Sequence, residues 1–366
     1  MSLPFLKSFK KALAKLENVS TGFSAPTYWY TTGNFALNKV LSGSYLRGIP
    51  QGRISSFVGP SAVGKSFIAC NVIREAQVTG ATVLVMDSEN ALDPVFMKRA
   101  GIDVDSDNLI YTQVVTLQDV TSVLSEFLTS YEKEYGRFNR SAPRVLVLLD
   151  SLGNCLTDAD DEKFEKGIAK GDQGQRAKVA KGLLRTLVPR LDRCNTTFVM
   201  TDQVYPQDPL LGDGPWAVTH GLKYSASQIA MMTKLKLKEE TEIIGIKMRI
   251  ETYKSRFAKP GTKIELEIPY NVGLTQIAGL LDAFVLDNVV KQGGAWYTTE
   301  IDDSSIKFQR REFDLAFAMT ILSKHKLIQK QEEDFLALQS VGTVEEIALL
   351  TEQPVSESDY ANVVID

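Results

Sequence analysis

The sequence is poor in residues that bind metals, form disulfides or cross membranes. Three cysteines, Cys70, Cys155 and Cys194, and two histidines occur among 366 residues. The thiols are far apart in the chain, unlike those of a disulfide framework or a zinc site, so we expect packing residues in a reducing cytosol. No apolar run reaches the roughly 20 residues that a bilayer crossing needs, and the first residues lack the pattern of an export signal. We therefore expect a soluble, cytoplasmic protein without a membrane partner.

Positive charge is missing from the C-terminal end. From Gln331 to Asp366 there are nine acidic side chains and no Lys or Arg. The whole chain has 41 basic and 45 acidic side chains, a net charge of −4, so residues 1–330 carry 41 minus 36, or +5. A mildly basic body with an acidic tail fits a protein that binds a polyanion, with a tail that competes for the same surface. A solvated, disordered end explains the tail equally well.

A short amphipathic helix is predicted near the N-terminus, from Pro4 to Glu17. Its apolar residues recur at helical spacing: Phe5, Leu6, Phe9, Leu13 and Leu16. Lysines occupy largely the other faces. Residues 18–28 are rich in Ser, Thr, Gly and Pro, which predicts a linker between this helix and the main body. An apolar face on a detached arm needs a partner, and we favour a neighbouring subunit over a membrane surface.

From Arg53 onward, short apolar runs alternate with helical stretches. The sequence predicts strands at Ile54–Val58 and Thr82–Met86, and helices at Ser66–Gln77 and near Leu117–Tyr131. Further strands are predicted at Val145–Leu149, Thr197–Thr201, Gln228–Thr233, Lys247–Tyr253 and Lys263–Ile268. This order favours an α/β fold with a central, mostly parallel sheet and helices on both faces. After Gly279 the composition indicates a small C-terminal domain.

The strongest local pattern follows the first of these strands. The run Gly59-Pro60-Ser61-Ala62-Val63-Gly64-Lys65-Ser66 matches the phosphate-binding loop G-x-x-x-x-G-K-[ST], between a predicted strand and a predicted helix. The glycines let backbone N–H groups close around phosphate oxygens, and the start of the helix adds positive potential. Lys65 then reaches the β- and γ-phosphates of ATP, and Ser66 ligates Mg²⁺. A chance match is the alternative, and the correct flanks disfavour it.

Two carboxylates are predicted at the carboxyl edge of the same sheet. The run from Arg144 to Asp150 is typical of a buried strand that ends in an acid, an arrangement that holds a water of the Mg²⁺ shell. Capping the next helix is the alternative role, more for Ser151 than for Asp150. The strand that ends at Met86 delivers Glu89 to this edge, where it can reach a water attacking the γ-phosphate. A solvated loop carboxylate is the alternative for Glu89.

Several runs, in this order, resemble the RecA family over roughly residues 28–300. They are Tyr30-Thr31-Thr32-Gly33, Leu37-Asn38-Lys39-Val40-Leu41, Gly48-Ile49-Pro50-Gln51-Gly52-Arg53, Asp87-Ser88-Glu89-Asn90-Ala91-Leu92-Asp93-Pro94 and Gly294-Ala295-Trp296-Tyr297. The resemblance implies a subunit-docking arm at residues 1–28, a RecA-like P-loop ATPase core at 29–275, and a small C-terminal α/β domain with an acidic tail at 276–366. Ser88 and the run Asp150-Ser151-Leu152-Gly153-Asn154 are similar to the UvsX type of bacteriophages, which implies a phage protein in a bacterial host cytoplasm.

The resemblance also implies roles for residues within one subunit. Glu89 would polarise the attacking water, and Gln203 would sense the γ-phosphate and pass its state to a DNA-binding loop. Phe96 would stack on adenine, with Asp93 nearby to contact the base. From the residues alone, Phe96 is equally a core residue, and Gln203 is equally an amide that satisfies loop backbone.

Other roles implied by the resemblance cross the boundary between subunits. Tyr270 would lie near the nucleotide from the neighbouring subunit. Lys254 and Arg256 would enter the ATP site of the next subunit, where cations stabilise the charge of the transition state. Without the resemblance, a solvated pair at a strand end is the better explanation of these two cations.

Two polar, Gly-rich segments follow the sheet edge at which RecA-like proteins hold DNA, near residues 157–181 and 204–221. The first carries cations expected to bind phosphates: Lys163, Lys166, Lys170, Arg176, Lys178 and Lys181. A solvated helix face is the alternative. The second segment has no Lys or Arg, so we expect it to use backbone N–H groups and Lys223 just beyond it. An apolar wedge between bases is expected at Leu210, Leu211 or Trp216, although Trp216 can equally pack beneath the segment.

Together these features predict an ATP-dependent DNA recombinase. The resemblance implies a helical filament on single-stranded DNA, pairing with homologous duplex DNA and strand exchange, with ATP and Mg²⁺ as cofactors. Single-strand-binding and loader proteins are expected partners. A ring-forming helicase shares such an ATPase core but needs different appendages, and a mediator that binds ATP without hydrolysis is opposed by Lys65, Glu89 and Asp150.

Overall fold

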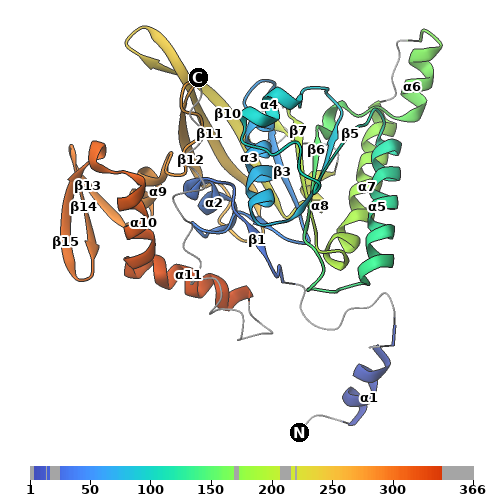
Figure 1. The fold of residues 1–366 in the computed structure, drawn as a ribbon, viewed down its shortest axis with the longest axis horizontal. Coiled ribbons are helices and arrows are strands. Elements are labelled where there is room, and N and C mark those ends of the chain that lie inside the picture. Colours follow the sequence, from blue (N-terminus) through green and yellow to red (C-terminus); the bar gives the residue numbers. More distant parts are fainter. Residues whose placement is uncertain are drawn as a thin grey trace.

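A computed structural model describes residues 4–13, 15–16, 25–168, 173–206, 216–218 and 221–339. At its centre lies an eight-stranded sheet in the order β12-β11-β10-β3-β7-β6-β4-β5 (Figure 1). Its strands are β3 (Ile54–Gly59), β4 (Thr82–Asp87), β5 (Leu109–Gln113), β6 (Val145–Asp150), β7 (Thr196–Gln203), β10 (Gln228–Glu239), β11 (Glu242–Ser255) and β12 (Lys263–Pro269). The strands from β10 to β5 run parallel, and β11 and β12 are antiparallel. The predicted mostly parallel sheet is confirmed, and each predicted strand is present and longer than expected.

Helices cover both faces of this sheet, as predicted (Figure 1). One face carries α2 (Phe35–Ser42), α3 (Lys65–Val78), α4 (Pro94–Arg99) and α9 (Leu280–Leu286), and the other carries α5 (Leu117–Tyr135), α7 (Gln173–Arg193) and α8 (Leu222–Ser225). Every residue of β6 is buried, because a central parallel strand is covered on both sides. The three cysteines are buried free thiols within these two apolar layers, which confirms their prediction as packing residues.

Smaller elements lie around the central sheet. They are the pair β1 (Trp29–Tyr30) and β2 (Ile49–Pro50), the pair β8 (Tyr205–Pro206) and β9 (Trp216–Ala217), the short helix η1 (Leu152–Asn154) and α6 (Asp158–Glu165). In Figure 1, α6 projects from the body at the upper right. Within the described ranges, no helix combines the length and the hydropathy that a bilayer crossing requires.

The predicted N-terminal helix is present but shorter than expected. It is α1 (Pro4–Leu13), which stands apart from the body in Figure 1. The helix ends early because the Leu16 N–H bonds to the Leu13 carbonyl, only three residues back, which tightens the chain into a turn. Tyr28, expected in the linker, instead packs edge-on against Tyr30 with a centroid distance of 5.0 Å. The body therefore begins before residue 28.

The C-terminal part is a small sheet with two helices, as predicted. It comprises β13 (Val290–Gly293), β14 (Trp296–Ile301), β15 (Ser304–Gln309), η2 (Arg310–Glu312), α10 (Leu315–Lys324) and α11 (Lys326–Gln339). It lies on the left of Figure 1, beyond α9. Because α11 continues to Gln339, the acidic stretch that starts at Gln331 begins inside a helix. Residues 340–366 of the expected tail lie outside the described residues.

A polar contact fastens α11 to the loop after α2. The Glu332 carboxylate accepts hydrogen bonds from the Ser44 hydroxyl at 2.7 Å, the Tyr45 N–H at 3.0 Å and Arg47 Nη1 at 2.5 Å. The side chains of Arg47 and Glu332 are 12% and 13% exposed. Removing one partner of such a pair leaves the others desolvated and unpaired, which costs more than the loss of a surface ion pair.

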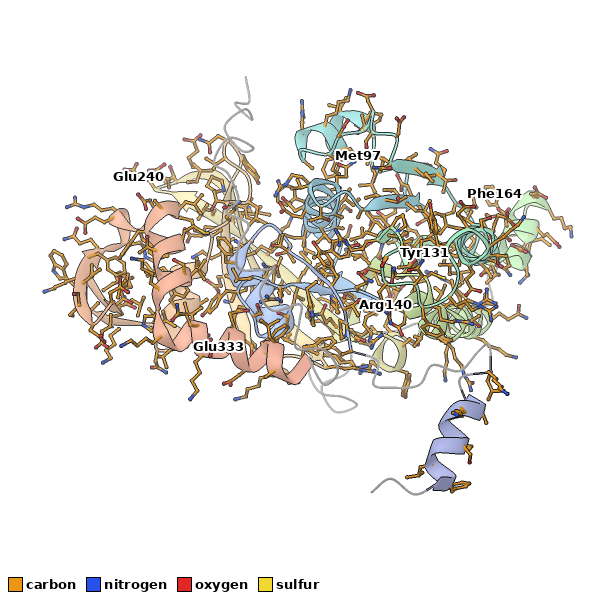
Figure 2. All side chains as sticks on the ribbon, turned by 60° about the horizontal axis from the view of Figure 1, so that its bottom comes forward. Met97, Tyr131, Arg140, Phe164, Glu240 and Glu333 are labelled. Carbon is orange, nitrogen blue, oxygen red and sulfur yellow. The ribbon has the colours of Figure 1, made fainter. Side chains whose placement is uncertain are left out.

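We expect Glu332→Ala to lower the free energy of unfolding by about 2 to 3 kcal/mol, because Arg47 and the Tyr45 N–H lose their acceptor. Urea unfolding followed by circular dichroism measures this change. Glu333→Ala is the matched control, since Glu333 is the exposed next residue of α11 (Figure 2). Equal stability of the two variants would contradict the role of Glu332.

Candidate functional site

The predicted phosphate-binding loop joins the end of β3 to the start of α3, at the carboxyl edge of the sheet. Its two glycines are required by close packing on the neighbouring strands. A Cβ on Gly59 would lie 2.4 Å from the carbonyl oxygen of Met232. Gly64 has a φ of +94°, and its Cβ position lies 2.6 Å from Met248 Cε. A side chain at either position would push the loop away from β10 and β11.

The ammonium of Lys65 is held inside this loop. Its Nζ atom donates to the carbonyl oxygens of Gly59, at 3.2 Å, and Pro60, at 2.9 Å. Burial lowers the pKa of Lys65, and nearby carboxylates oppose that shift. The carboxylates are those of Glu89, Asp150 and Asp202. The ammonium of Lys65 thus lies in the phosphate-binding loop, near carboxylates at the ends of three different strands.

Asp150 ends β6 with its carboxylate buried. Its Oδ1 atom accepts a hydrogen bond from the Thr201 hydroxyl on β7, and its Oδ2 atom is buried without a hydrogen-bond partner in the described part of the chain. Burial raises the pKa of Asp150, and the nearby hydroxyls of Ser66 and Thr201 oppose that shift. A buried carboxylate oxygen without a donor, near the hydroxyl of Ser66, suits a hydrated Mg²⁺.

Ser66 and Asp150 are a small candidate set of metal ligands. Among the described residues, no group of three or more His, Cys, Asp or Glu side chains is arranged to hold a metal ion. Mg²⁺ commonly takes one or two protein ligands and completes its octahedral shell with water and phosphate oxygens. Ser66 and Asp150 therefore fit a magnesium ion that arrives with a nucleotide.

Glu89 is anchored to the loop that follows β6. The Ser151 hydroxyl donates to Glu89 Oε1 at 2.5 Å, and the Ser88 hydroxyl donates to the Ser151 carbonyl at 2.8 Å. The Asp87 carboxylate accepts from the Glu89 N–H at 2.9 Å and from the Tyr111 hydroxyl at 2.9 Å. Burial and this hydrogen bond raise the pKa of Tyr111 to about 12, so its hydroxyl stays a donor. Glu89 is exposed itself, but its position is fixed from two sides.

Gln203 reaches the same edge from the next strand. It is the last residue of β7, as predicted, and it pairs in register with Gly59, the first residue of the phosphate-binding loop. The Gln203 N–H donates to Asp202 Oδ1 at 2.9 Å. A Cβ on Gly153 would lie 2.7 Å from the same Asp202 oxygen, so η1 packs closely against the end of β7.

The residues expected to contact the adenine base have structural roles around α4. Asp93 caps this helix by accepting a hydrogen bond from the Phe96 N–H at 2.8 Å. Phe96 is partly buried against the apolar layer beneath it. Tyr270 follows β12 and is 67% exposed. Core packing therefore accounts for the buried part of the Phe96 side chain, whereas Tyr270 is largely exposed.

Lys254 and Arg256 lie at the opposite edge of the sheet. The last residue of β11 pairs with Gln228, the first residue of β10, and Gln228 pairs with Ser55 near the start of β3. The phosphate-binding loop starts at Gly59, four residues further along β3. At about 3.3 Å per residue, roughly 13 Å of strand separates the two positions. The sheet thus keeps these cations away from the phosphate-binding loop of their own subunit.

The first predicted DNA-binding segment contains helices in place of a loop. Its first cations lie on α6 and at its C-terminal cap: Lys163, in the helix, approaches Asp160 at 4.0 Å, and Lys166, the cap residue, approaches Glu162 at 3.6 Å. Five acids and one lysine make up the charge of residues 158–165. Lys163 and Lys166 therefore face carboxylates of their own helix, which weakens them as phosphate ligands.

Phe164 shows that α6 does not pack on the body of the protein. Its side chain is 78% exposed and points outward at the edge of Figure 2. No residue of α6 is buried. The helix is the solvated face that the sequence left open as an alternative.

A row of cations continues along the exposed face of α7: Lys178, Lys181 and Arg185. Lys178 and Arg185 form no ion pair within the ranges that the structure describes. Arg176 is different, because its Nε and Nη2 atoms are buried, without a hydrogen-bond partner in the same ranges. Lys170, predicted in this segment, lies outside the described residues.

The second predicted segment is described only at its two ends. Trp216, in β9, is partly buried against the apolar layer, as its packing alternative predicts. Lys223, in α8, places its Nζ atom 5.2 Å from the centre of the Tyr253 ring. Leu210 and Leu211 lie outside the described residues.

Three residues of this edge were missed from the sequence. Ser151 holds Glu89, Thr201 holds Asp150, and Arg185 extends the row of cations on α7. Thr201 could not be identified, because the adjacency of β6 and β7 appears only in the sheet order. Arg185 had a signal, since it stands four residues after Lys181, a spacing that places two side chains on one face of a helix.

Comparison with known proteins agrees with this geometry. The model of the RecA N-terminal domain family matches residues 7–275. Protein RecA of Acidothermus cellulolyticus is 29% identical over 312 residues, covering 83% of this chain and 85% of the relative. Protein RecA of Nocardioides sp. is 27% identical over 341 residues, covering 92% and 90%. Protein RecA of Streptomyces coelicolor is 28% identical over 305 residues, covering 81% and 76%.

A pH series tests the burial of Asp150. Because the pKa of Asp150 is raised in the folded state, its ionised form opposes folding, and this penalty grows as the pH rises through the folded-state pKa. We therefore expect the thermal unfolding midpoint of Asp150→Asn to increase relative to that of the parent protein as the pH rises from about 4 to about 8. Calorimetry in EDTA, without nucleotide, measures the gain.

The matched control is Asp105→Asn, since Asp105 is an exposed carboxylate paired with Lys98 at 3.1 Å. Its effect on the thermal midpoint should stay small and nearly flat over the same pH range. A gain for Asp150→Asn that shrinks toward high pH would show that the carboxylate is not penalised by burial.

Proposed function

The chain belongs to the RecA family, and we propose which of its residues carry the activity of that family. As a member, the protein is an ATP-dependent DNA recombinase that acts in recombination and repair. It is a DNA-dependent ATPase that binds single-stranded and duplex DNA, forms filaments and exchanges strands. The assignment of individual residues to these steps is our proposal.

ATP binds at the carboxyl edge of the sheet, with its phosphates in the loop from Gly59 to Ser66. Lys65 leaves the loop carbonyls and reaches the β- and γ-phosphates, while backbone N–H groups at the start of α3 bind the remaining oxygens. Ser66 and Asp150 hold Mg²⁺, which when bound neutralises charge on the β- and γ-phosphates. The partnerless Oδ2 atom of Asp150 is the observation that favours this set.

Glu89 positions the attacking water. Hydrolysis of the γ-phosphate leaves the protein one acid–base task, which is to orient a water in line with the leaving oxygen. The Ser151 hydroxyl, which donates to the Glu89 carboxylate, and the Asp87 carboxylate, which accepts from the Glu89 N–H, hold Glu89 at the edge where Gln203 pairs with Gly59. Gln203 then contacts the γ-phosphate and relays its presence to the segment that begins at residue 204.

Lys254 and Arg256 complete the site of the adjacent subunit. Their place at the opposite edge of the sheet supports this, because one subunit cannot supply both the loop and these cations to one nucleotide. Tyr270 would contact the nucleotide from the same neighbour. Phe96 and Asp93 are proposed near the base, with the capping and packing roles described above retained. Hydrolysis then requires assembly.

DNA runs along α7 and the segment after β7. Lys178, Lys181 and Arg185 lie about one to two turns apart on one exposed face, a spacing that suits successive phosphates. Arg176, Lys170 and Lys223 are proposed as further cations of this surface, and Leu210, Leu211 or Trp216 as the wedge. Lys163 and Lys166 contribute less, because acids of α6 compete for them.

We propose further that the protein is a phage-type member of the family. The run Asp150-Ser151-Leu152-Gly153-Asn154 and Ser88 support this, and η1 and the Ser88 contact with Ser151 give that run a place in the site. Single-strand-binding and loader proteins would be its partners in a bacterial host cytoplasm.

Glu89→Gln tests the catalytic assignment. We expect DNA-stimulated ATP turnover to fall by about 10² to 10⁴, because the amide cannot accept the proton of the water. Affinity for single-stranded DNA in the presence of a non-hydrolysable ATP analogue should stay within about twofold of the parent. Steady-state kinetics and fluorescence anisotropy measure the two quantities.

Glu134→Gln, at the exposed end of α5, is the control for this change and should alter neither quantity. Full turnover by Glu89→Gln would remove Glu89 from the mechanism, and a loss of DNA binding would point to a failure of assembly instead.

Salt dependence tests the DNA surface. Each phosphate contact contributes about 0.7 to the slope of log affinity against log salt concentration on single strands. We expect Lys178→Gln with Arg185→Gln to reduce the slope by about 1.4. Lys163→Gln with Lys166→Gln should leave it nearly unchanged, because both lysines are paired on α6. The reverse pattern would place DNA on α6.

A further inference from the structure

The ammonium of Lys254 is already held by two backbone carbonyls of its own subunit. Its Nζ atom donates to the carbonyl oxygen of Lys223 at 2.5 Å and to that of Ala226 at 2.7 Å. The first oxygen belongs to α8 and the second to Ala226, the residue that caps its C-terminal end, where carbonyls lack partners within the helix and a cation is favoured. A lysine has three N–H donors, so these bonds leave one for another acceptor.

Carbonyl oxygens differ from carboxylates as partners for a cation. They orient the ammonium, but they carry no net charge and do not neutralise it. Burial and the nearby Arg256 lower the pKa of Lys254, and no carboxylate contributes to its shift. Lys254 is therefore held by α8 through oxygens that carry no net negative charge to offset its own, as a residue that must stabilise phosphate charge requires.

The backbone beneath Lys254 is fixed from the other side, by α2. The Ser255 hydroxyl donates to the Leu41 carbonyl at 2.9 Å, and the Thr252 hydroxyl donates to the Val40 carbonyl at 2.6 Å. The end of β11 is thus anchored to a helix that takes no part in the DNA segments. The side chain of Lys254, in contrast, is held by carbonyls at α8.

Helix α8 is also the first element after the second DNA segment, and it packs on α7. The Nζ atom of Lys181, in the row of cations on α7, lies 5.4 Å from the centre of the Tyr224 ring. The side chain of Lys181 lies so close to Gly221, before α8, that a Cβ there would be 2.9 Å from it. Both proposed DNA surfaces therefore meet this four-residue helix, whose Leu222 is fully buried.

We propose that α8 is the positioning element for Lys254, and that DNA on the adjoining segments sets the rate of ATP hydrolysis in the next subunit by moving this helix. The carbonyls of Lys223 and Ala226 aim the ammonium, and the third N–H contacts the γ-phosphate of the neighbour. This inference rests on the proposed role of Lys254 across the subunit boundary.

Loosening α8 tests the inference without touching Lys254. Leu222→Ala removes the side chain that anchors α8 in the apolar layer, and Leu128→Ala removes the same volume from α5 in that layer, as the matched control. We expect Leu222→Ala to lower DNA-stimulated kcat about tenfold, because a misplaced charge loses transition-state stabilisation. The KM for ATP should change by less than about threefold, since the neighbour grips the nucleotide. Leu128→Ala should retain kcat within about twofold.

A double-variant cycle with Lys254→Ala separates positioning from general damage. Lys254→Ala alone should lower kcat by about 10² or more, and adding Leu222→Ala should cause no further loss, because both changes act through one ammonium. A full additional tenfold loss in the double variant, or an equal loss in Leu128→Ala, would overturn the role of α8. Full activity of Lys254→Ala would instead overturn the proposed role of Lys254 itself.

All variants are first checked for filaments on single-stranded DNA by electron microscopy. Should Leu222→Ala fail to assemble, Ala226→Gly replaces it, since it frees the backbone at the end of α8 and removes one buried methyl group. We expect a loss of kcat of several-fold that again disappears in the Lys254→Ala background. Unchanged kcat in Ala226→Gly would count against the inference.

Discussion

The two ends of a parallel strand lie at opposite edges of its sheet, and this constraint organises the molecule. The phosphate-binding loop, Glu89 and Asp150 follow the carboxyl ends of β3, β4 and β6, while Lys254 lies where β11 ends, beside the start of β10. About four residues of β3 separate the two groups. A nucleotide bound at one edge can receive the cations of the other edge only from a second subunit. In the proposed mechanism, filament assembly and chemistry are thereby linked through the geometry of one sheet.

Burial shifts the pKa values of charged groups at the carboxyl edge of the sheet. Asp150 is desolvated and keeps one oxygen without a donor, and Lys65 is desolvated beside three carboxylates. Such an arrangement opposes folding of the empty subunit, and the nucleotide and cation proposed to bind here would relieve it. The Thr201 hydroxyl holds the Asp150 carboxylate, and the Ser151 hydroxyl holds the Glu89 carboxylate. Neither hydroxyl adds a charge of its own.

The helices proposed to line the DNA differ in the same way. The α6 helix is acidic and solvated, whereas α7 is anchored in the apolar layer and presents its cations outward. Because α8 contacts α7 and also holds Lys254, a displacement on the DNA side has a short path to the amino edge of the sheet. The backbone of β11 is tied to α2, so the proposed path acts on the side chain of Lys254 while the strand end stays anchored.

The sequence by itself determined the parallel sheet, the phosphate-binding loop and the carboxylates at its edge. Apolar runs of strand length and a contiguous loop motif are local signals. They can be identified without knowing which elements lie next to each other in the fold. Other features depend on contacts within one helical turn, which the periodicity of apolar residues does not reveal. They are the bounds of α6, the pairing of Lys163 and Lys166, and the capping role of Asp93. Thr201 beside Asp150, Ser151 beside Glu89 and the carbonyls of α8 beside Lys254 were decided by tertiary structure alone. These pairs join residues 28 to 62 positions apart, and only the order of strands in the sheet brings them within hydrogen-bond distance.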